Sequence, residues 1–199
     1  VVVDATFTLG RVSAQPMEPR AVAAIYDPTT ERLTVHLATQ SVNLAHNGIS
    51  QMLGLPKERV RVIVPNIGGA FGVKTRMYGE EVLAAHLAMR LGRPMRWVGS
   101  RDEEFTVTNQ ARAQVHHVRM GLDQDGHILA FTDHYIQDAG AYNVTASGPA
   151  FNIALSAHGP YRIPHLEMTG AIVLTTTTPT GPYRGAGRPE AAYVMERIL

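Results

Sequence analysis

Strand-type and helix-type patterns of apolar residues alternate along the chain, and this alternation most constrains its fold. Residues 33–38 and 60–64 alternate apolar and polar side chains as half-buried strands do. Between them, residues 41–53 place apolar side chains at helical spacing, and Gly54 and Pro56 end the run. This region therefore predicts the order strand, helix, strand.

The remaining segments continue the mixture. They predict strands over residues 1–9 and 95–98, helices over 80–91 and 189–199, and a hairpin over 114–138 that turns at 123–126. Ser100 and Glu103 form a capping box for a further short helix. Because helix 80–91 is apolar nearly all round, we expect it to be buried. The expected fold class is α+β, with mixed sheets and packed helices. We expect residues 1–199 to form part of a single larger domain, with a boundary between two sub-lobes near residue 110.

Composition and charge exclude several classes of protein. The 199 residues are 45% hydrophobic and carry a net charge of +1. The basic residues are dispersed along the chain. A nucleic-acid binder would gather those residues on one face, so no nucleic-acid partner is expected. No long apolar run predicts a membrane span. With no cysteine, the segment holds no thiolate-bound iron–sulfur cluster or zinc site.

The chain ends point to a larger protein. Val1 already lies in a strand-type run, and helix 189–199 has a marked start at Pro189 but no glycine or asparagine stop after Leu199. We expect the natural polypeptide to continue.

Three places are candidates for binding a ligand. The first is the glycine segment 68–74 (Gly-Gly-Ala-Phe-Gly-Val-Lys), where backbone N–H groups can approach an anion closely. The second is residues 181–188, where glycines and two arginines lead into the last helix, an arrangement that favours a phosphate or an electron-rich ligand edge. The third is Gln40, at a strand-to-helix junction. A surface turn, a solvated arginine and an exposed glutamine are the respective alternatives.

The nine histidines predict no metal site. His116 and His117 are adjacent in a predicted strand, so their side chains point to opposite faces and cannot hold one metal ion. His86 and His134 are better explained as residues of the core edge or the surface. We therefore expect no metal ligand from the protein.

Taken together and in order, three of these segments carry a resemblance to a known family. Thr39-Gln40, residues 68–74 and residues 182–190 resemble the molybdopterin-binding large subunit of the xanthine dehydrogenase, aldehyde oxidase and aerobic carbon monoxide dehydrogenase family of molybdenum hydroxylases. Met17-Glu18-Pro19-Arg20 and Gly92-Arg93-Pro94 resemble it as well. The resemblance covers essentially the whole chain.

The resemblance implies a molybdenum-pterin cofactor, in the molybdopterin cytosine dinucleotide form, which brings its own metal ligands. It assigns catalytic roles to Gln40, Phe71 and Arg184. Gln40 matches the glutamine whose amide hydrogen-bonds an oxo group on molybdenum, and Phe71 matches the aromatic residue near the substrate path. The residues implied to bind the cofactor are Gln40, Gly68, Gly69, Ala70, Phe71, Gly72, Arg184 and Gly185.

The chain departs from the family pattern in places. Ala70 and Val73 stand where glycines are frequent, and Thr75 stands where xanthine-type enzymes have a glutamate, which argues against purine specificity. Gly185 follows Arg184 where copper-linked carbon monoxide dehydrogenases have a cysteine. The family's general-base glutamate belongs to a later segment, so this chain alone should be inactive.

The function expected from these features is hydroxylation of an aldehyde or N-heterocycle with oxygen derived from water. The resemblance implies the remainder of the large subunit, iron–sulfur clusters and FAD on partner subunits, a small organic substrate and a cytoplasmic location, with no nucleic acid and no membrane as partners. A non-catalytic or degenerate module of the same fold and a simple phosphate-binding domain are the alternatives.

Overall fold

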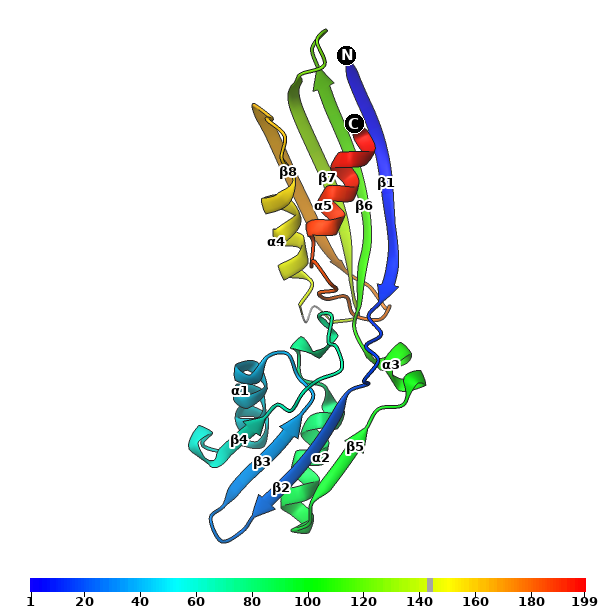
Figure 1. Ribbon diagram of the computed structural model, residues 1–199. Coiled ribbons are helices and arrows are strands. Elements are labelled where there is room, and N and C mark those ends of the chain that lie inside the picture. The colour runs from blue at the N-terminus through cyan, green and yellow to red at the C-terminus, as the bar shows by residue number, and fades with distance from the viewer. Residues whose placement is uncertain (143–144) are drawn as a thin grey trace. The chain divides into compact units, whose positions relative to one another are not determined.

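The computed structural model of the chain describes residues 1–142 and 145–199 (Figure 1). The chain divides into two compact units. The first unit comprises residues 1–14 and 108–199, and the second unit comprises residues 15–107. Each unit has its own four-stranded sheet and its own apolar core, and both sheets mix parallel and antiparallel pairs. The expected α+β class with mixed sheets is confirmed.

The second unit is built on a sheet with the strand order β4-β3-β2-β5. Its strands are β2 (Ala21–Asp27), β3 (Arg32–Leu37), β4 (Val60–Ile63) and β5 (Met95–Val98). β3 and β4 run parallel because α1 (Val42–Leu53) returns the chain across the sheet between them. The predicted order of strand, helix and strand is therefore confirmed, whereas β2 is absent from the predicted elements.

The helix α2 (Gly79–Leu91) packs one face on this sheet. Ala84, Ala85 and Ala88 are buried in the core of the second unit, together with residues of β2 and β3. Leu83 and Leu91 are 54% and 56% exposed, so the expectation of a helix buried all round is wrong. A helix that covers one side of a single sheet buries only the stripe that faces the sheet.

Short helices complete the second unit: η1 (Lys57–Arg59), η2 (Val73–Thr75) and α3 (Arg101–Val107). The capping box before α3 is confirmed, because Ser100 N–H donates to Glu103 Oε2 over 2.6 Å and Glu103 N–H donates to Ser100 Oγ over 3.2 Å. Ser41 occupies the N-cap position of α1, but its hydroxyl makes no capping hydrogen bond.

A buried arginine joins the start of β2 to α2 and α3. Arg20 is 0% exposed, and its Nε donates to Glu104 Oε1 over 2.9 Å. Its guanidinium lies 4.0 Å from the centroid of the Tyr78 ring, and Nη1 reaches Glu80 Oε2 at 3.4 Å. Burial opposes the charge, but the two glutamates outweigh it and raise the pKa of Arg20. These contacts thus tie α2 and α3 to the start of β2.

The first unit is built on a sheet with the strand order β1-β6-β7-β8. The strands are β1 (Val2–Ser13), β6 (Gln110–Leu122), β7 (Ile128–Gly140) and β8 (His165–Leu174). The predicted hairpin is the antiparallel pair of β6 and β7. The parallel strand β8 and the helix that precedes it, α4 (Ser147–Ser156), are absent from the predicted elements.

Two helices, α4 and α5 (Arg188–Ile198), cover one face of this sheet (Figure 1). Val194, Met195 and Ile198 of α5 pack against Met120 and Phe131 of the sheet. A chain of polar groups also crosses this buried face: His116 Nδ1 contacts Asp133 Oδ2 at 2.7 Å, His116 Nε2 contacts Gln114 Oε1 at 3.1 Å, and Gln114 Nε2 donates to Gln137 Oε1 over 3.0 Å. These bonds reduce the penalty of burying polar side chains, although Asp133 Oδ1 has no hydrogen-bond partner among the described residues.

A close approach of backbone sets the start of α5. Gly187 has φ 100°, and a Cβ at this position would lie 2.2 Å from the carbonyl oxygen of Pro149 in α4. Only glycine therefore lets α5 begin against α4. The segment that leads into α5 includes Arg184, so this contact also fixes the loop of the second candidate site.

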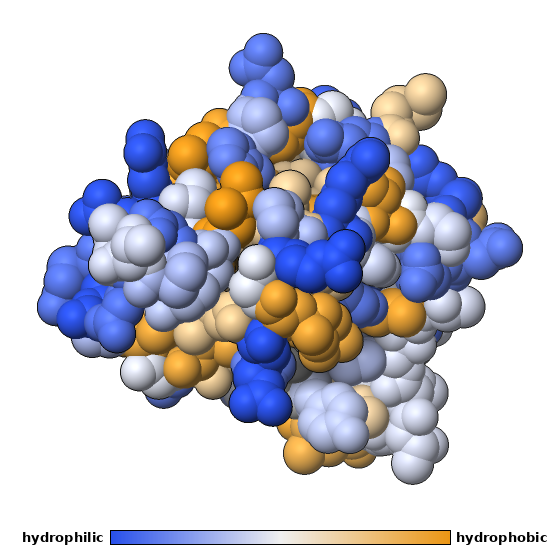
Figure 2. All heavy atoms as spheres, turned by 90° about the horizontal axis from the view of Figure 1, so that it is seen from below, coloured by the Kyte–Doolittle hydropathy of each residue, from blue (hydrophilic) through white to orange (hydrophobic). Residues whose placement is uncertain are grey.

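The surface shows no large continuous apolar area on the face drawn in Figure 2, where apolar side chains lie in separate patches between hydrophilic ones. Exposed apolar side chains include Met52 of α1 and Leu83 of α2. Among the helices of the described residues, none combines the length and the apolar character needed to cross a membrane.

Glu81 predicts how the stability of the second unit depends on pH. Burial raises the pKa of Glu81 from 4.5 to about 7, although the N–H of Tyr78 and the charge of Arg20 oppose the rise. Between these values the folded chain binds more protons than the unfolded chain, so the free energy of unfolding falls as the pH rises. Glu81→Gln keeps an acceptor for Tyr78 N–H and removes the titration. As the pH rises from about 4 to about 8, the wild type should lose on the order of 3 kcal/mol in the free energy of unfolding relative to Glu81→Gln.

Denaturant unfolding followed by the fluorescence of Trp97, the single tryptophan, measures this difference. Glu58→Gln, which changes an exposed glutamate, is the control, and its free energy of unfolding should depend on pH as that of the wild type does. Parallel curves for Glu81→Gln and the wild type would contradict the prediction.

Gly187→Ala should destabilise the first unit, because the methyl group meets Pro149 O and the positive φ is unfavourable to alanine. We expect a loss of about 2 to 4 kcal/mol in the free energy of unfolding. Thermal unfolding followed by circular dichroism measures it. Gly148→Ala in α4, whose Cβ would meet nothing within 4 Å, should change stability by less than about 1 kcal/mol. Equal effects of the two variants would show that the contact is not restrictive.

Candidate cofactor site

The glycine segment forms a strained bend between β4 and η2. Gly69, Phe71 and Gly72 have φ of 97°, 50° and 100°. Phe71 shows that the bend is strained, because a positive φ costs a residue with a side chain on the order of 1 kcal/mol. This conformation persists only where the surrounding structure imposes it. We call residues 68–74 the glycine loop.

The bend leaves backbone donors and an aromatic ring at the surface. Phe71 is 40% exposed, and its ring lies so close to Gly69 that a Cβ there would be 3.0 Å from Phe71 Cε2. Within residues 1–142 and 145–199, the N–H groups of Gly69 and Ala70 donate to no acceptor. The loop therefore presents two backbone donors beside one aromatic wall, which suits a ligand that offers acceptor atoms.

Gln40 lies against the glycine loop. The side-chain Oε1 of Gln40 accepts the N–H of Gly72 over 2.9 Å, and the backbone N–H of Gln40 donates to the carbonyl of Lys74 over 3.1 Å. Because Gly72 N–H is a donor, the side-chain atom that faces it must be the oxygen. The amide nitrogen Nε2 then points elsewhere, and it finds no acceptor in the described part of the chain. Gln40 is exposed, so this donor is available to a ligand.

Two residues outside the predicted set hold this loop. Lys74 Nζ and Gly68 N–H both donate to Glu18 Oε2, each over 2.8 Å. A buried lysine needs a counter-charge, but nothing in the sequence identifies the carboxylate 56 residues upstream of Lys74 as its partner.

Arg184 lies in the first unit, on the exposed loop before α5. The next three residues, Gly185, Ala186 and Gly187, have φ of 95°, 46° and 100°. Asn152 Nδ2 of α4 donates to the carbonyl of Ala186 over 2.8 Å. The loop is thus held by α4, and Arg184 is carried at its exposed side.

A buried carboxylate anchors the same loop to the sheet. Glu190 is 1% exposed; its Oε2 accepts Gly187 N–H over 3.0 Å and its Oε1 accepts Arg112 Nη1 over 2.9 Å. The Arg112 guanidinium also lies 5.1 Å from the centroid of the Tyr183 ring. Glu190 therefore has a structural task that its place near the start of the last predicted helix does not reveal.

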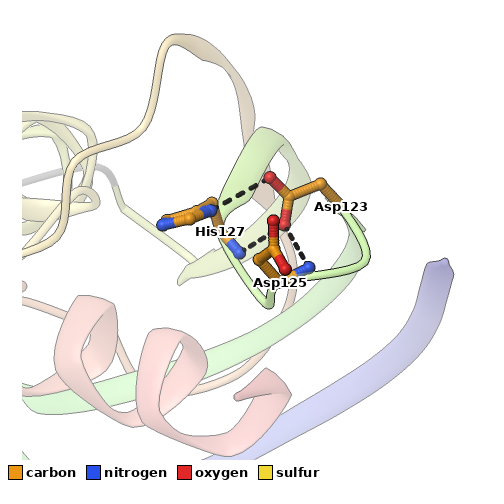
Figure 3. A group of neighbouring side chains, drawn as sticks. All are labelled: Asp123, Asp125 and His127. Carbon is orange, nitrogen blue, oxygen red and sulfur yellow. Dashed lines mark hydrogen bonds and ion pairs between the residues drawn. The ribbon is translucent and has the colours of Figure 1, made fainter.

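The predicted opposite orientation of His116 and His117 is confirmed, since His116 is 0% exposed and His117 is exposed. One group in the described residues has the composition of a metal site: Asp123, Asp125 and His127, in the turn between β6 and β7 (Figure 3). Asp123 Oδ1 accepts the N–H groups of Asp125 and His127 over 2.9 and 2.8 Å, and Oδ2 contacts His127 Nδ1 at 3.0 Å. These bonds close the turn, so the turn itself explains the cluster.

The donors of the glycine loop fit a ligand that carries its own metal. Neither Gln40 Nε2 nor a backbone N–H can coordinate a metal ion, but each can donate to oxygen or nitrogen atoms of an organic cofactor. Gly68 to Gly72 offer almost no side chain between backbone and ligand except the ring of Phe71. The donor set therefore matches a pterin-type cofactor rather than a bare ion.

Two curated proteins are similar over nearly the whole chain. The subunit gamma of the 6-hydroxypseudooxynicotine dehydrogenase complex from Paenarthrobacter nicotinovorans is 39% identical over 194 residues, which are 97% of this chain and 24% of that protein. The carbon monoxide dehydrogenase large chain from Hydrogenophaga pseudoflava is 32% identical over 193 residues, 95% of this chain and 24% of that protein.

Solved structures share the fold. The quinoline 2-oxidoreductase from Pseudomonas putida 86 superposes with a TM-score of 0.87 at 32% identity, over 98% of this chain and 27% of that one. A Cu,Mo-CO dehydrogenase superposes with a TM-score of 0.93 at 32% identity, over 100% of this chain and 25% of that one. This chain spans about a quarter of the length of these relatives. Residues 1–199 match the family described as the molybdopterin cofactor-binding domain, and the chain belongs to that family.

Proposed function

We propose that this chain forms one wall of the molybdenum-pterin site of a hydroxylase, which inserts water-derived oxygen into an N-heterocycle or an aldehyde. The observation that carries the proposal is the orientation of Gln40. Its oxygen is occupied by Gly72 N–H, and its amide nitrogen is directed away with no acceptor in residues 1–142 and 145–199. When bound, the cofactor supplies the metal centre for a two-electron oxidation, and the residues of this chain bind and orient it.

The glycine loop holds the cofactor by its backbone. The N–H groups of Gly69 and Ala70 are available as donors, and Gln40 Nε2 adds a third. Donors that are fixed before the ligand arrives cost little reorganisation on binding. The exposed ring of Phe71 forms the wall on the substrate side and excludes water from it.

Arg184 offers a positive charge that suits an electron-rich ligand. The loop that carries Arg184 is held by α4 and by Glu190, so its backbone keeps its shape without help from a ligand. In the proposed enzyme, Arg184 faces substrate or cofactor, and Gly185 lets the backbone turn beside it.

The proposed substrate class rests on the substrates for which the relatives are named and on the absence of cysteine from this chain. Relatives are named for nicotine, nicotinate and quinoline as well as for aldehydes and carbon monoxide. This chain has no cysteine, and Gly185 follows Arg184 where a copper-linked centre needs one. We therefore favour an N-heterocycle or an aldehyde over carbon monoxide.

The proposed enzyme needs further protein. The relatives are described as a subunit gamma of a complex and as large chains or subunits. We propose that the remainder of such a subunit completes the site and that iron–sulfur clusters and FAD on partner subunits remove the electrons.

Metal and nucleotide analysis tests the assignment. The native protein should release molybdenum and cytidine monophosphate in equal amounts, about one of each per chain, after acid treatment. Elemental analysis and chromatography of the released nucleotide measure them. A protein that is isolated folded and contains neither would overturn the proposed function, and molybdenum with a different nucleotide would overturn the cytosine form.

Gln40→Glu tests the donor. The substituted carboxylate still accepts Gly72 N–H, but an oxygen replaces Nε2 and repels acceptor atoms of the cofactor. We expect turnover per bound molybdenum to fall about 100-fold, as for the loss of one fixed donor at a reacting centre. Gln51→Glu on the exposed side of α1 is the matched control and should retain wild-type turnover. Unchanged turnover in Gln40→Glu would contradict the role of this amide.

A further inference from the structure

One carboxylate oxygen ties the two ends of the glycine loop together. Glu18 Oε2 accepts Gly68 N–H, at the start of the loop, and Lys74 Nζ, at its end, each over 2.8 Å. The backbone repeats the link, because Glu18 N–H donates to the carbonyl of Gly68 over 3.2 Å. A loop closed at both ends by one group has few ways to change its curvature.

The link is also an ion pair whose lysine is buried. The side chain of Lys74 is 0% exposed, and Glu18 is its only carboxylate partner among residues 1–142 and 145–199. Burial alone would raise the pKa of the Glu18 carboxyl, but the hydrogen bonds from Lys74 and Gly68 outweigh it and hold the pKa below its usual value. A charge-assisted pair of this kind is stronger than neutral hydrogen bonds and fixes its geometry more tightly.

Steric contact sets the position of the loop on Glu18. A Cβ at Gly68 would lie 2.7 Å from Glu18 Cβ and 3.4 Å from the Glu18 nitrogen. Glycine at this position therefore lets the loop lie directly on the backbone of residue 18. The carboxylate contact and the absence of a side chain at residue 68 act together.

The link reaches Gln40 through Lys74. The carbonyl of Lys74 accepts Gln40 N–H over 3.1 Å and Thr39 Oγ1 over 2.9 Å, while Gly72 N–H donates to Gln40 Oε1. Lys74 thus holds Glu18 with its ammonium group and Gln40 with its carbonyl. A shift of Lys74 would move both the main chain and the amide of Gln40.

We propose that Glu18 is a positioning residue for the cofactor site, which sets the direction of Gln40 Nε2 and of the Gly69 and Ala70 N–H groups through the glycine loop. This inference rests on the proposed function, because those donors are the ones assigned to the cofactor. Glu18 itself touches neither cofactor nor substrate in this assignment. It acts by holding both ends of a strained bend.

Glu18→Gln in the native protein with its cofactor is the first test. The variant retains an acceptor for Gly68 N–H but leaves Lys74 without a counter-charge. We expect turnover per bound molybdenum to fall roughly 10- to 100-fold with KM little changed, together with a shifted Mo(V) resonance signal. Hydrogen exchange of residues 68–74 in cofactor-free protein should become roughly 10-fold faster, with β3 unaffected. Glu31→Gln, which breaks the exposed pair with Arg59, is the control and should change none of these.

The double variant Glu18→Gln/Lys74→Met separates positioning from stability. It removes the buried charge as well, so the free energy of unfolding should recover toward the wild type. The proposal predicts that turnover per molybdenum and the exchange of the loop do not recover with it. Recovery of both along with stability would overturn the proposal, as would wild-type turnover and exchange in Glu18→Gln. A wild type without molybdenum and cytidine monophosphate would instead overturn the proposed function, and the exchange measurement would still report on the link.

Discussion

The buried ammonium group of Lys74 is the constraint that organises the glycine loop and the residues around it. A charged group taken out of water is tolerated only with a counter-charge and hydrogen bonds, and the Glu18 carboxylate supplies both. Meeting that need brings residue 18 against residue 68. Since the Lys74 carbonyl also receives Thr39 and Gln40, one residue joins three segments that are far apart in the sequence.

This anchoring explains how an unfavourable backbone can persist. Phe71 adopts a positive φ between two glycines that do the same. Such a bend would relax in a free peptide, because each residue would return to the more populated region. Here the ends are held by Glu18 and the middle is held by the Gln40 side chain at Gly72. The strain is therefore retained next to the N–H groups of Gly69 and Ala70.

Local signals in the sequence predict much of the fold and part of the site. The capping box at Ser100, the hairpin at 114–138 and the last helix follow from periodicity and end signals, and the structure has all three. β2 and β8 escape prediction, since β2 contains three alanines among seven residues and β8 is largely exposed, so neither shows a clear strand pattern. The helix α4 begins with Ser-Gly-Pro, which suggests a turn. Gln40 and the glycine loop are visible in the sequence, but the pairing of Glu18 with Lys74 depends on tertiary contact alone.

The two glycine-rich loops share one physical device although they lie in different units. In each, a carboxylate accepts the N–H of a loop glycine and also binds a cation: Glu18 holds Gly68 and Lys74, and Glu190 holds Gly187 and Arg112. Glycine gives the loop its curvature but no side chain with which to fix it. A carboxylate that bonds the backbone directly supplies the missing restraint, and the cation adds a charge-assisted contact that fixes the carboxylate in turn. Rigid loops with exposed donors follow from this combination, whatever ligand they bind.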